Sequence, residues 1–164
     1  MEVRPAEEGD RPWVAELCRR HFGAKVVAVL GRLHRPALLP CLVAWAKGER
    51  VGALSFCEDE RGAEVVLLAA DSPGRGAGGA LLGALEELGR RRGWERLWLV
   101  VTNDNTPALR LYQRRGWDLA ALHAGAVERD RLLKPEIPLH GVDGIPVRHL
   151  LELRRTLDAS GPER

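Results

Sequence analysis

Hydrophobic and polar residues alternate along this chain in patterns that predict one mixed domain of helices and strands. Apolar residues recur at helical spacing after Asp10-Arg11-Pro12 as far as about Phe22, and again from Ala80 to about Arg92. Val3 and its neighbours predict a short first strand. Further runs of strand character cover residues 42–45, 51–57, 64–70, 97–101 and 117–122.

The connections between these runs predict how the strands pair. Lys47-Gly48-Glu49-Arg50 predicts a hairpin turn. The strand over residues 64–70 leads through a helix to the strand over residues 97–101, so these two strands are expected to be parallel. Another helix begins at Thr106-Pro107 and ends before Gly116. The predicted fold class is α/β (α+β): a single mixed sheet with an antiparallel N-terminal meander, one βαβ crossover and flanking helices.

One domain is expected over residues 1–157, followed by a C-terminal tail over residues 158–164. The pattern does not predict the secondary structure of two segments. Residues 24–40 combine an apolar patch with glycine and prolines and suit a strand followed by a loop that covers a substrate. Residues 123–146 form an irregular excursion, after which residues 147–153 return to a strand pattern.

Composition narrows the class of protein. Hydrophobic residues make up 45% and charged residues 29% of 164 residues, with a formal charge of +2, as in a soluble globular protein without a nucleic-acid-binding face. No signal sequence or membrane span is evident, so a cytoplasmic location is expected. The three cysteines and five histidines show no metal-binding spacing; we expect no metal, and reduced, buried thiols.

The glycine-rich stretch 74–80, with the sequence GRGAGGA, lies between the strand over residues 64–70 and the following helix. Bare N–H groups at a helix start, with the positive end of the helix dipole behind them, form a binding site for phosphate. Three interpretations fit: a dinucleotide-binding fingerprint, an acyl-CoA-binding loop, and a flexible turn without a ligand. A Walker loop is excluded because no Gly-Lys-Ser/Thr follows.

Topology and a second motif separate these interpretations. A dinucleotide-binding domain begins at its fingerprint strand, whereas here antiparallel strands come first and one crossover follows. Arg75-x-x-Gly78-x-Ala80 is followed, after a helix and a strand, by Asn105-x-x-Ala108-x-x-Leu111-Tyr112 and then Arg115-Gly116-Trp117. This ordered set resembles the GNAT N-acetyltransferases over about residues 50–122.

The resemblance implies that the chain binds acetyl-CoA. It places the cofactor-binding positions on the glycine loop, on the preceding strand and at the next helix: Leu68, Ala70, Arg75, Gly76, Ala77, Gly78, Gly79, Ala80 and Asn105. It makes Tyr112 the general acid. Core packing for Tyr112, a helix cap for Asn105 and a surface position for Arg75 remain open. The family often has a bulky apolar residue where this chain has Gly79.

The implied reaction is direct attack of a primary amine on the thioester in a ternary complex. Glu64 and Glu58 are the candidate general bases. Cys57 as a nucleophile lacks an evident pattern of histidine and carboxylate around it. The acceptor, a small molecule or a protein or peptide amine, stays undetermined. A non-catalytic module that senses acyl-CoA is the alternative, and residues 147–153 are the candidate homodimer interface.

Overall fold

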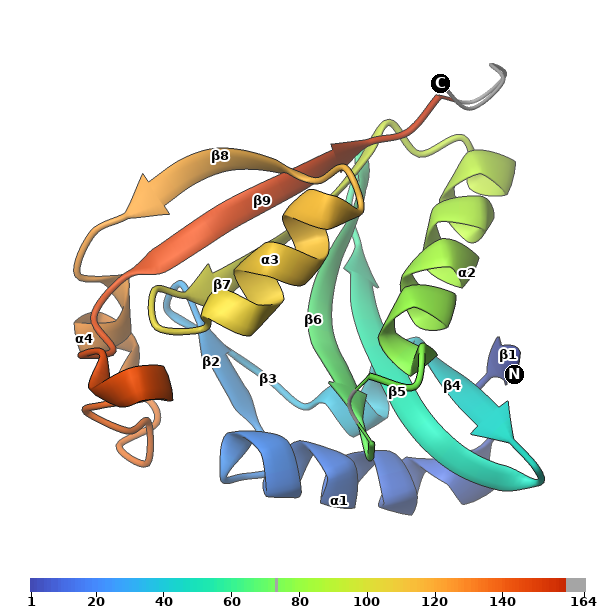
Figure 1. Cartoon of the computed structure of the whole chain (residues 1–164), viewed down its shortest axis with the longest axis horizontal. Coiled ribbons are helices and arrows are strands. Elements are labelled where there is room, and N and C mark those ends of the chain that lie inside the picture. The colour runs from blue at the N-terminus through green and yellow to red at the C-terminus, as the bar shows by residue number, and fades with distance from the viewer. Residues whose placement is uncertain (73, 159–164) are drawn as a thin grey trace.

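The structure is a computed structural model that describes residues 1–72 and 74–158 (Figure 1). Its strands are β1 (Glu2–Pro5), β2 (Val27–Val29), β3 (Arg32–His34), β4 (Cys41–Ala46), β5 (Glu49–Glu58), β6 (Gly62–Ala70), β7 (Arg96–Thr102), β8 (Asp118–His123) and β9 (Leu150–Thr156). Its α-helices are α1 (Arg11–Phe22), α2 (Ala77–Arg92), α3 (Thr106–Arg114) and α4 (Ala126–Asp130). The predicted tail falls mainly on residues 159–164, which lie outside the described residues.

Seven strands form one mixed sheet in the order β1-β4-β5-β6-β7-β9-β8. Every neighbouring pair is antiparallel except β6 and β7, which α2 connects as the predicted crossover. The mixed sheet with an antiparallel meander and flanking helices is therefore confirmed. The parallel pairing runs only from Gly62 opposite Arg96 to Glu64 opposite Trp98, so the two strands separate beyond that point.

Some element boundaries differ from the prediction. Helix α2 begins at Ala77 and not at Ala80, because Gly76 takes the left-handed conformation, with a φ of 85°, and lets the helix start earlier. Residues 24–40 contain the small hairpin of β2 and β3, whose turn residues Leu30 and Gly31 both have positive φ. The excursion after β8 contains the short helix α4.

The last strand lies inside the sheet and not at its edge. Strand β9 begins at Leu150 and pairs with β7 on one side and with β8 on the other. Strand pairing through residues 147–153 would need a free edge. Strand β9 therefore has no free edge for pairing with a second copy, and a homodimer interface at residues 147–153 stays a prediction; β1 and β8 are the two edges of this sheet.

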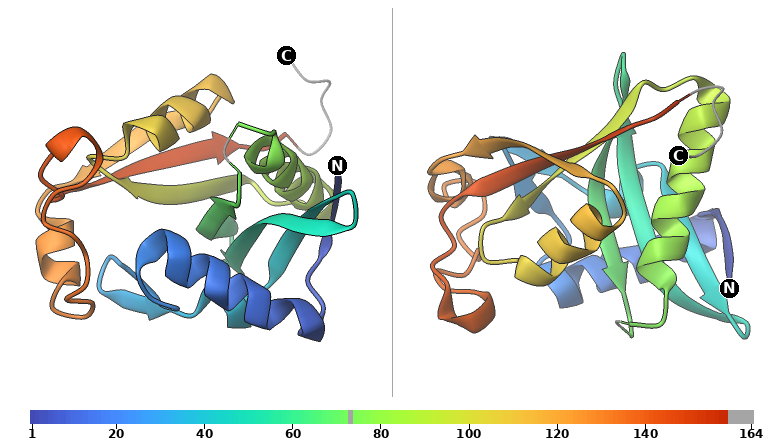
Figure 2. Two further views of the ribbon diagram at one scale, coloured as in Figure 1. Left: turned by 60° about the horizontal axis from the view of Figure 1, so that its bottom comes forward. Right: turned by 45° about the horizontal axis from the view of Figure 1, so that its top comes forward.

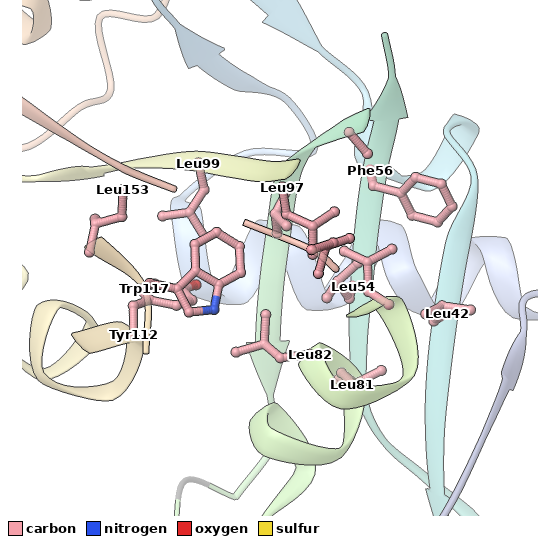
Figure 3. Packing of buried hydrophobic residues seen from close by; sticks show 14 of the residues in the cluster. Leu42, Leu54, Phe56, Leu81, Leu82, Leu97, Leu99, Tyr112, Trp117 and Leu153 are labelled. Atoms are coloured by element: carbon pink, nitrogen blue, oxygen red, sulfur yellow. The ribbon is translucent and has the colours of Figure 1, made fainter. Parts of the chain in front are cut away.

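Two hydrophobic layers cover the sheet (Figure 2). Helices α2 and α3 lie on one face and bury a cluster that includes Leu54, Leu81, Leu97 and Trp117 (Figure 3). Helix α1 covers the other face, where Leu17 joins a second cluster. Burial of this apolar surface is the main force that stabilises the fold.

Candidate active site

Where β6 separates from β7, residues of both strands line a cleft of about 470 Å³. Its walls come from β6, β7, the start of α3, the end of α1, strand β2 and the excursion after β8. The volume falls within the range of small-molecule sites. A gap of this kind also leaves the edge of β6 that faces β7 unpaired beyond Glu64.

The first turn of α2 supplies backbone donors. The first intrahelical hydrogen bond runs from the N–H of Ala80 to the carbonyl of Gly76, at 3.0 Å. The N–H groups of Gly76, Ala77, Gly78 and Gly79 precede it and have no partner within the helix. The amide of Ala80 is thus engaged within the helix, unlike the four amides before it.

This helix start fits a diphosphate group. Gly76 has left-handed backbone geometry that a side chain would strain, and neither Gly76 nor Gly78 carries atoms that would keep a phosphate away from the amides. Arg75 is exposed beside them. Four N–H groups without an intrahelical partner, at the positive end of a 16-residue helix, are donors of the kind that bind anions.

Tyr112 and Asn105 both line the cleft. Tyr112 is 6% exposed, and its ring lies 5.4 Å from that of Trp117, so it is a core residue and a cleft residue together (Figure 3). Burial raises the pKa of Tyr112 above its ordinary value of 10.0, so the hydroxyl keeps its proton at neutral pH. The side chain of Asn105 caps α3 by accepting from the N–H of Ala108 at 3.2 Å.

Of the two predicted cofactor-binding positions on β6, only one lines the cleft. Leu68 lines the cleft, whereas Ala70 pairs with Gly52 and is not among the cleft-lining residues that the structure describes. Two residues before Leu68, β6 contains a β-bulge: Val65 and Leu67 lie opposite Phe56 and Ser55, which leaves Val66 as the extra residue. Val66 also lines the cleft.

Glu64 lies where β6 and β7 part, and it is 3% exposed. Arg32 on β3 holds its carboxylate through contacts of 2.8 Å and 3.1 Å. The other candidate base, Glu58, forms an exposed ion pair with Arg92 away from the cleft. Of the two carboxylates, only Glu64 lines the cleft.

The sequence shows no histidine and carboxylate pattern around Cys57, but the fold places His34 and Glu64 near it. Its Sγ lies 4.0 Å from Nδ1 of His34, whose Nε2 lies 3.9 Å from Oε1 of Glu64. Burial raises the pKa of the Cys57 thiol and lowers the pKa of His34, which opposes a thiolate–imidazolium pair. Neither Cys57 nor His34 is among the described residues that line the cleft.

Long-range contacts hold the far side of the cleft together. Asp130, 2% exposed at the end of α4, accepts from the N–H groups of Leu30 and Gly31 at 3.0 Å and 2.8 Å. Lys134 donates to the carbonyls of Phe22 and Val26 at 2.7 Å and 3.0 Å. These two residues tie the excursion to the end of α1 and to the β2–β3 turn.

Asp104 adds a third tie on this side. Its Oδ2 accepts from the N–H of Val142 at 3.1 Å, and a Cβ on Gly141 would lie 1.9 Å from that oxygen. The sequence analysis missed Asp104, Asp130, Lys134 and Arg32. No local pattern marks them, because their partners lie between 32 and 112 residues away in the chain.

A family model for the acetyltransferase (GNAT) family matches residues 6–117, more than half of the chain. The chain belongs to this family. Two relatives from Bacillus subtilis (strain 168) align with 96% of the chain and 99% of their own length. These are the uncharacterized proteins YxbD, 40% identical over 158 residues, and YdhI, 31% identical over 159 residues.

Solved structures share the fold. A putative acetyltransferase, yncA from Salmonella typhimurium with its cofactor acetyl-CoA, superposes with a TM-score of 0.70 at 18% identity, covering 100% of this chain and 98% of that one. A Bacillus subtilis acetyltransferase in complex with CoA gives 0.69 at 17% identity, covering 95% and 98%. The ribosomal-protein-S18-alanine N-acetyltransferase of Escherichia coli gives 0.68 at 16% identity, covering 98% and 96%.

None of the helices in residues 1–72 and 74–158 is long and apolar enough to cross a membrane. The same residues contain no group of three or more histidine, cysteine, aspartate or glutamate side chains that could hold a metal ion.

Proposed function

We propose that this protein is an acetyl-CoA-dependent N-acetyltransferase that moves an acetyl group to a primary amine by direct attack in a ternary complex. The observation that carries the proposal is the separation of β6 from β7 beyond Glu64, which opens a cleft that Tyr112 and Asn105 line. The GNAT relatives whose structures contain CoA or acetyl-CoA support this cosubstrate.

In this proposal the cofactor side of the cleft binds through backbone and cap groups. The amides of Gly76 to Gly79 hold the diphosphate, with Arg75 beside them. The unpaired edge of β6 near Leu68 and the amide of Asn105 hold the pantetheine arm. Acetyl-CoA supplies an activated thioester carbonyl, and the bulged strand at Val66 offers backbone groups to polarise it.

Two side chains handle the protons. Glu64 accepts the proton that the amine loses, directly or through one water. Tyr112 donates its proton where the thiolate leaves. The ordinary pKa of tyrosine is about 10 and that of a thiol about 8.5. Transfer of a proton from Tyr112 to the thiolate therefore costs about 2 kcal/mol of free energy. Desolvation in the cleft raises the pKa of Tyr112, and it raises the pKa of the leaving thiol in the same direction. Burial of both groups therefore adds little to the cost of the proton transfer.

The test is amine-dependent release of CoA thiol, measured for the wild type and for Tyr112→Phe. The variant keeps the ring that packs on Trp117 and loses only the hydroxyl. We expect kcat to fall roughly ten- to a thousandfold while the Kd for acetyl-CoA stays within about twofold. An unchanged kcat, under conditions where chemistry limits the rate, removes Tyr112 from the mechanism.

The same assay separates an enzyme from a sensor. Binding of acetyl-CoA without thiol release, across a panel of small amines and peptides with free N-termini or lysines, is the behaviour of a non-catalytic acyl-CoA-binding module. Release that depends on a small amine or on a peptide identifies the class of acceptor.

A further inference from the structure

An arginine from α3 reaches across to the first two turns of α2. Arg115 follows the last residue of α3, and its backbone N–H donates to the carbonyls of Leu111 and Tyr112. A Cβ placed on Gly79 would lie 3.3 Å from its Nη1, and a Cβ placed on Gly83 would lie 3.7 Å from its Nη2. The guanidinium therefore lies along the face of α2 where Gly79 and Gly83 leave room.

Keeping this space open with glycine costs helix stability. Glycine within a helix destabilises it by about 1 kcal/mol relative to alanine. A bulky side chain at Gly79 would occupy the space that now holds Nη1 of Arg115. The absence of side chains at Gly79 and Gly83 thus provides the space that the guanidinium of Arg115 occupies.

Arg115 has no anionic partner among the described residues. No carboxylate there lies within ion-pair distance of it, and its Nε is buried without a hydrogen bond. The buried carboxylate of Glu86, also on α2, lies 3.8 Å from Arg155 instead. A cation beside the positive end of a helix is unfavourable by about 0.3–1 kcal/mol, which an anion at the same place would reverse.

We propose that Arg115 is a further cofactor-binding residue, whose guanidinium binds a phosphate group of acetyl-CoA beside the first turn of α2. This inference rests on the proposed cofactor and not on acetyl transfer. The amides of α2 and the guanidinium then bind the phosphates from two sides. A guanidinium suits this role because its planar set of N–H donors matches phosphate oxygens. CoA carries a diphosphate and a 3′-phosphate, and both offer this chemistry.

The experiment is calorimetric titration of the full chain with CoA and with 3′-dephospho-CoA. Arg115→Met keeps an unbranched apolar stem and removes the charge. The matched control is Arg114→Met, an exposed neighbour on the same helix. We expect the Kd for CoA to rise roughly ten- to a hundredfold in Arg115→Met, as for a lost charged hydrogen bond, and less than twofold in the control. Arg115→Lys should recover part of the affinity.

The two ligands identify the phosphate. If Arg115 binds the 3′-phosphate, Arg115→Met and the wild type bind 3′-dephospho-CoA equally. If it binds the diphosphate, the affinity for both ligands falls by the same factor. Both results support the proposal. Equal affinity of wild type and Arg115→Met for CoA overturns it and leaves Arg115 a packing residue, whatever the change in thermal stability.

A second variant tests the role of the open space. Gly79→Leu fills the space of the guanidinium, so it should weaken CoA binding by a factor similar to that of Arg115→Met. The double variant should be no weaker than either single variant, because both remove one interaction. Additive losses would contradict the proposal. CoA binding with no acetyl transfer would end the proposed activity and leave the role of Arg115 intact.

Discussion

The two sides of the cleft are built in opposite ways. On the cofactor side the key contacts are local: Ala80 bonds Gly76, and Asn105 caps the helix that contains Ala108. On the far side of the cleft, the proposed acceptor side, the key contacts join distant segments: Asp130 accepts from Leu30 and Gly31, 100 and 99 residues away. The hydrogen bonds of the first side are formed within one helix, whereas those of the second require that distant segments have come together.

The difference bears on what each side recognises. Backbone amides at a helix start can bind phosphate with little help from neighbouring side chains, so much of the proposed cofactor side depends on main-chain groups. The acceptor side is shaped by side chains such as Asp104 and Lys134 that fix loops. Changes there can alter the acceptor without disturbing the cofactor. The comparison therefore predicts that the two sides can be broken separately.

The largest expected effect is at the point where the two sides meet. Glu64→Gln removes the proposed base, so kcat/KM for the amine should fall roughly a hundred- to ten-thousandfold at neutral pH. The control is Glu58→Gln, which changes an exposed carboxylate outside the cleft and should leave the rate unaltered. Rates of thiol release measure both. Equal rates for Glu64→Gln and wild type would show that Glu64 is not the base and serves only as the ion-pair partner of Arg32.

Asp130→Ala should damage the acceptor side alone. It leaves two backbone N–H groups without their acceptor, and Leu30 needs that support because its φ of 50° is strained for leucine. We expect a loss of about 2–4 kcal/mol in the free energy of unfolding, with CoA affinity in the folded protein unchanged.

Urea denaturation and titration with CoA measure these two quantities. The control is Glu128→Ala on the same short helix, which breaks an exposed ion pair with Arg148 and should cost less than about 1 kcal/mol. A large loss of CoA affinity in Asp130→Ala would show that the two sides are not separable.

Two asparagines, two residues apart, sharpen the comparison. Asn105 caps α3 on the cofactor side, whereas Asn103 bonds the backbone of Pro146, Arg148 and His149, each at 2.9 Å. Asn105→Ala should cost about 1 kcal/mol of stability and weaken CoA binding several-fold. Asn103→Ala should cost about 1–3 kcal/mol and raise the KM for the amine instead. The same defect in both variants would contradict the division.

Tyr112 provides the smallest and most local test. Because burial raises its pKa, the unfolded chain ionises first, so this contribution to stability is intact below pH 10 and is lost as the pH rises further. The loss should approach about 1.4 kcal/mol per pH unit relative to Tyr112→Phe. It is the only tyrosine in the chain, so tyrosinate absorbance reports it directly. An ordinary titration near pH 10 in the folded protein would contradict its burial.

The sequence predicted the strands and helices around the glycine loop better than the long-range contacts on the far side of the cleft, for the same physical reason. Periodicity and glycine positions mark strands, helices and turns, because those signals are local. Nothing local indicates that β9 inserts between β7 and β8, or that a leucine at position 30 takes left-handed geometry. That conformation depends on Asp130, and the missed proximity of Cys57 to His34 depends on how β3 packs.

The most direct test of the central claim is the thermal unfolding midpoint with acetyl-CoA, CoA, NAD and ATP in parallel. A ligand at 100 times its Kd adds about 2.7 kcal/mol to the free energy of unfolding. We predict a rise of the midpoint with acetyl-CoA and CoA and none with NAD or ATP. A rise with NAD alone, or with none of the four, would contradict an acyl-CoA site between β6 and β7.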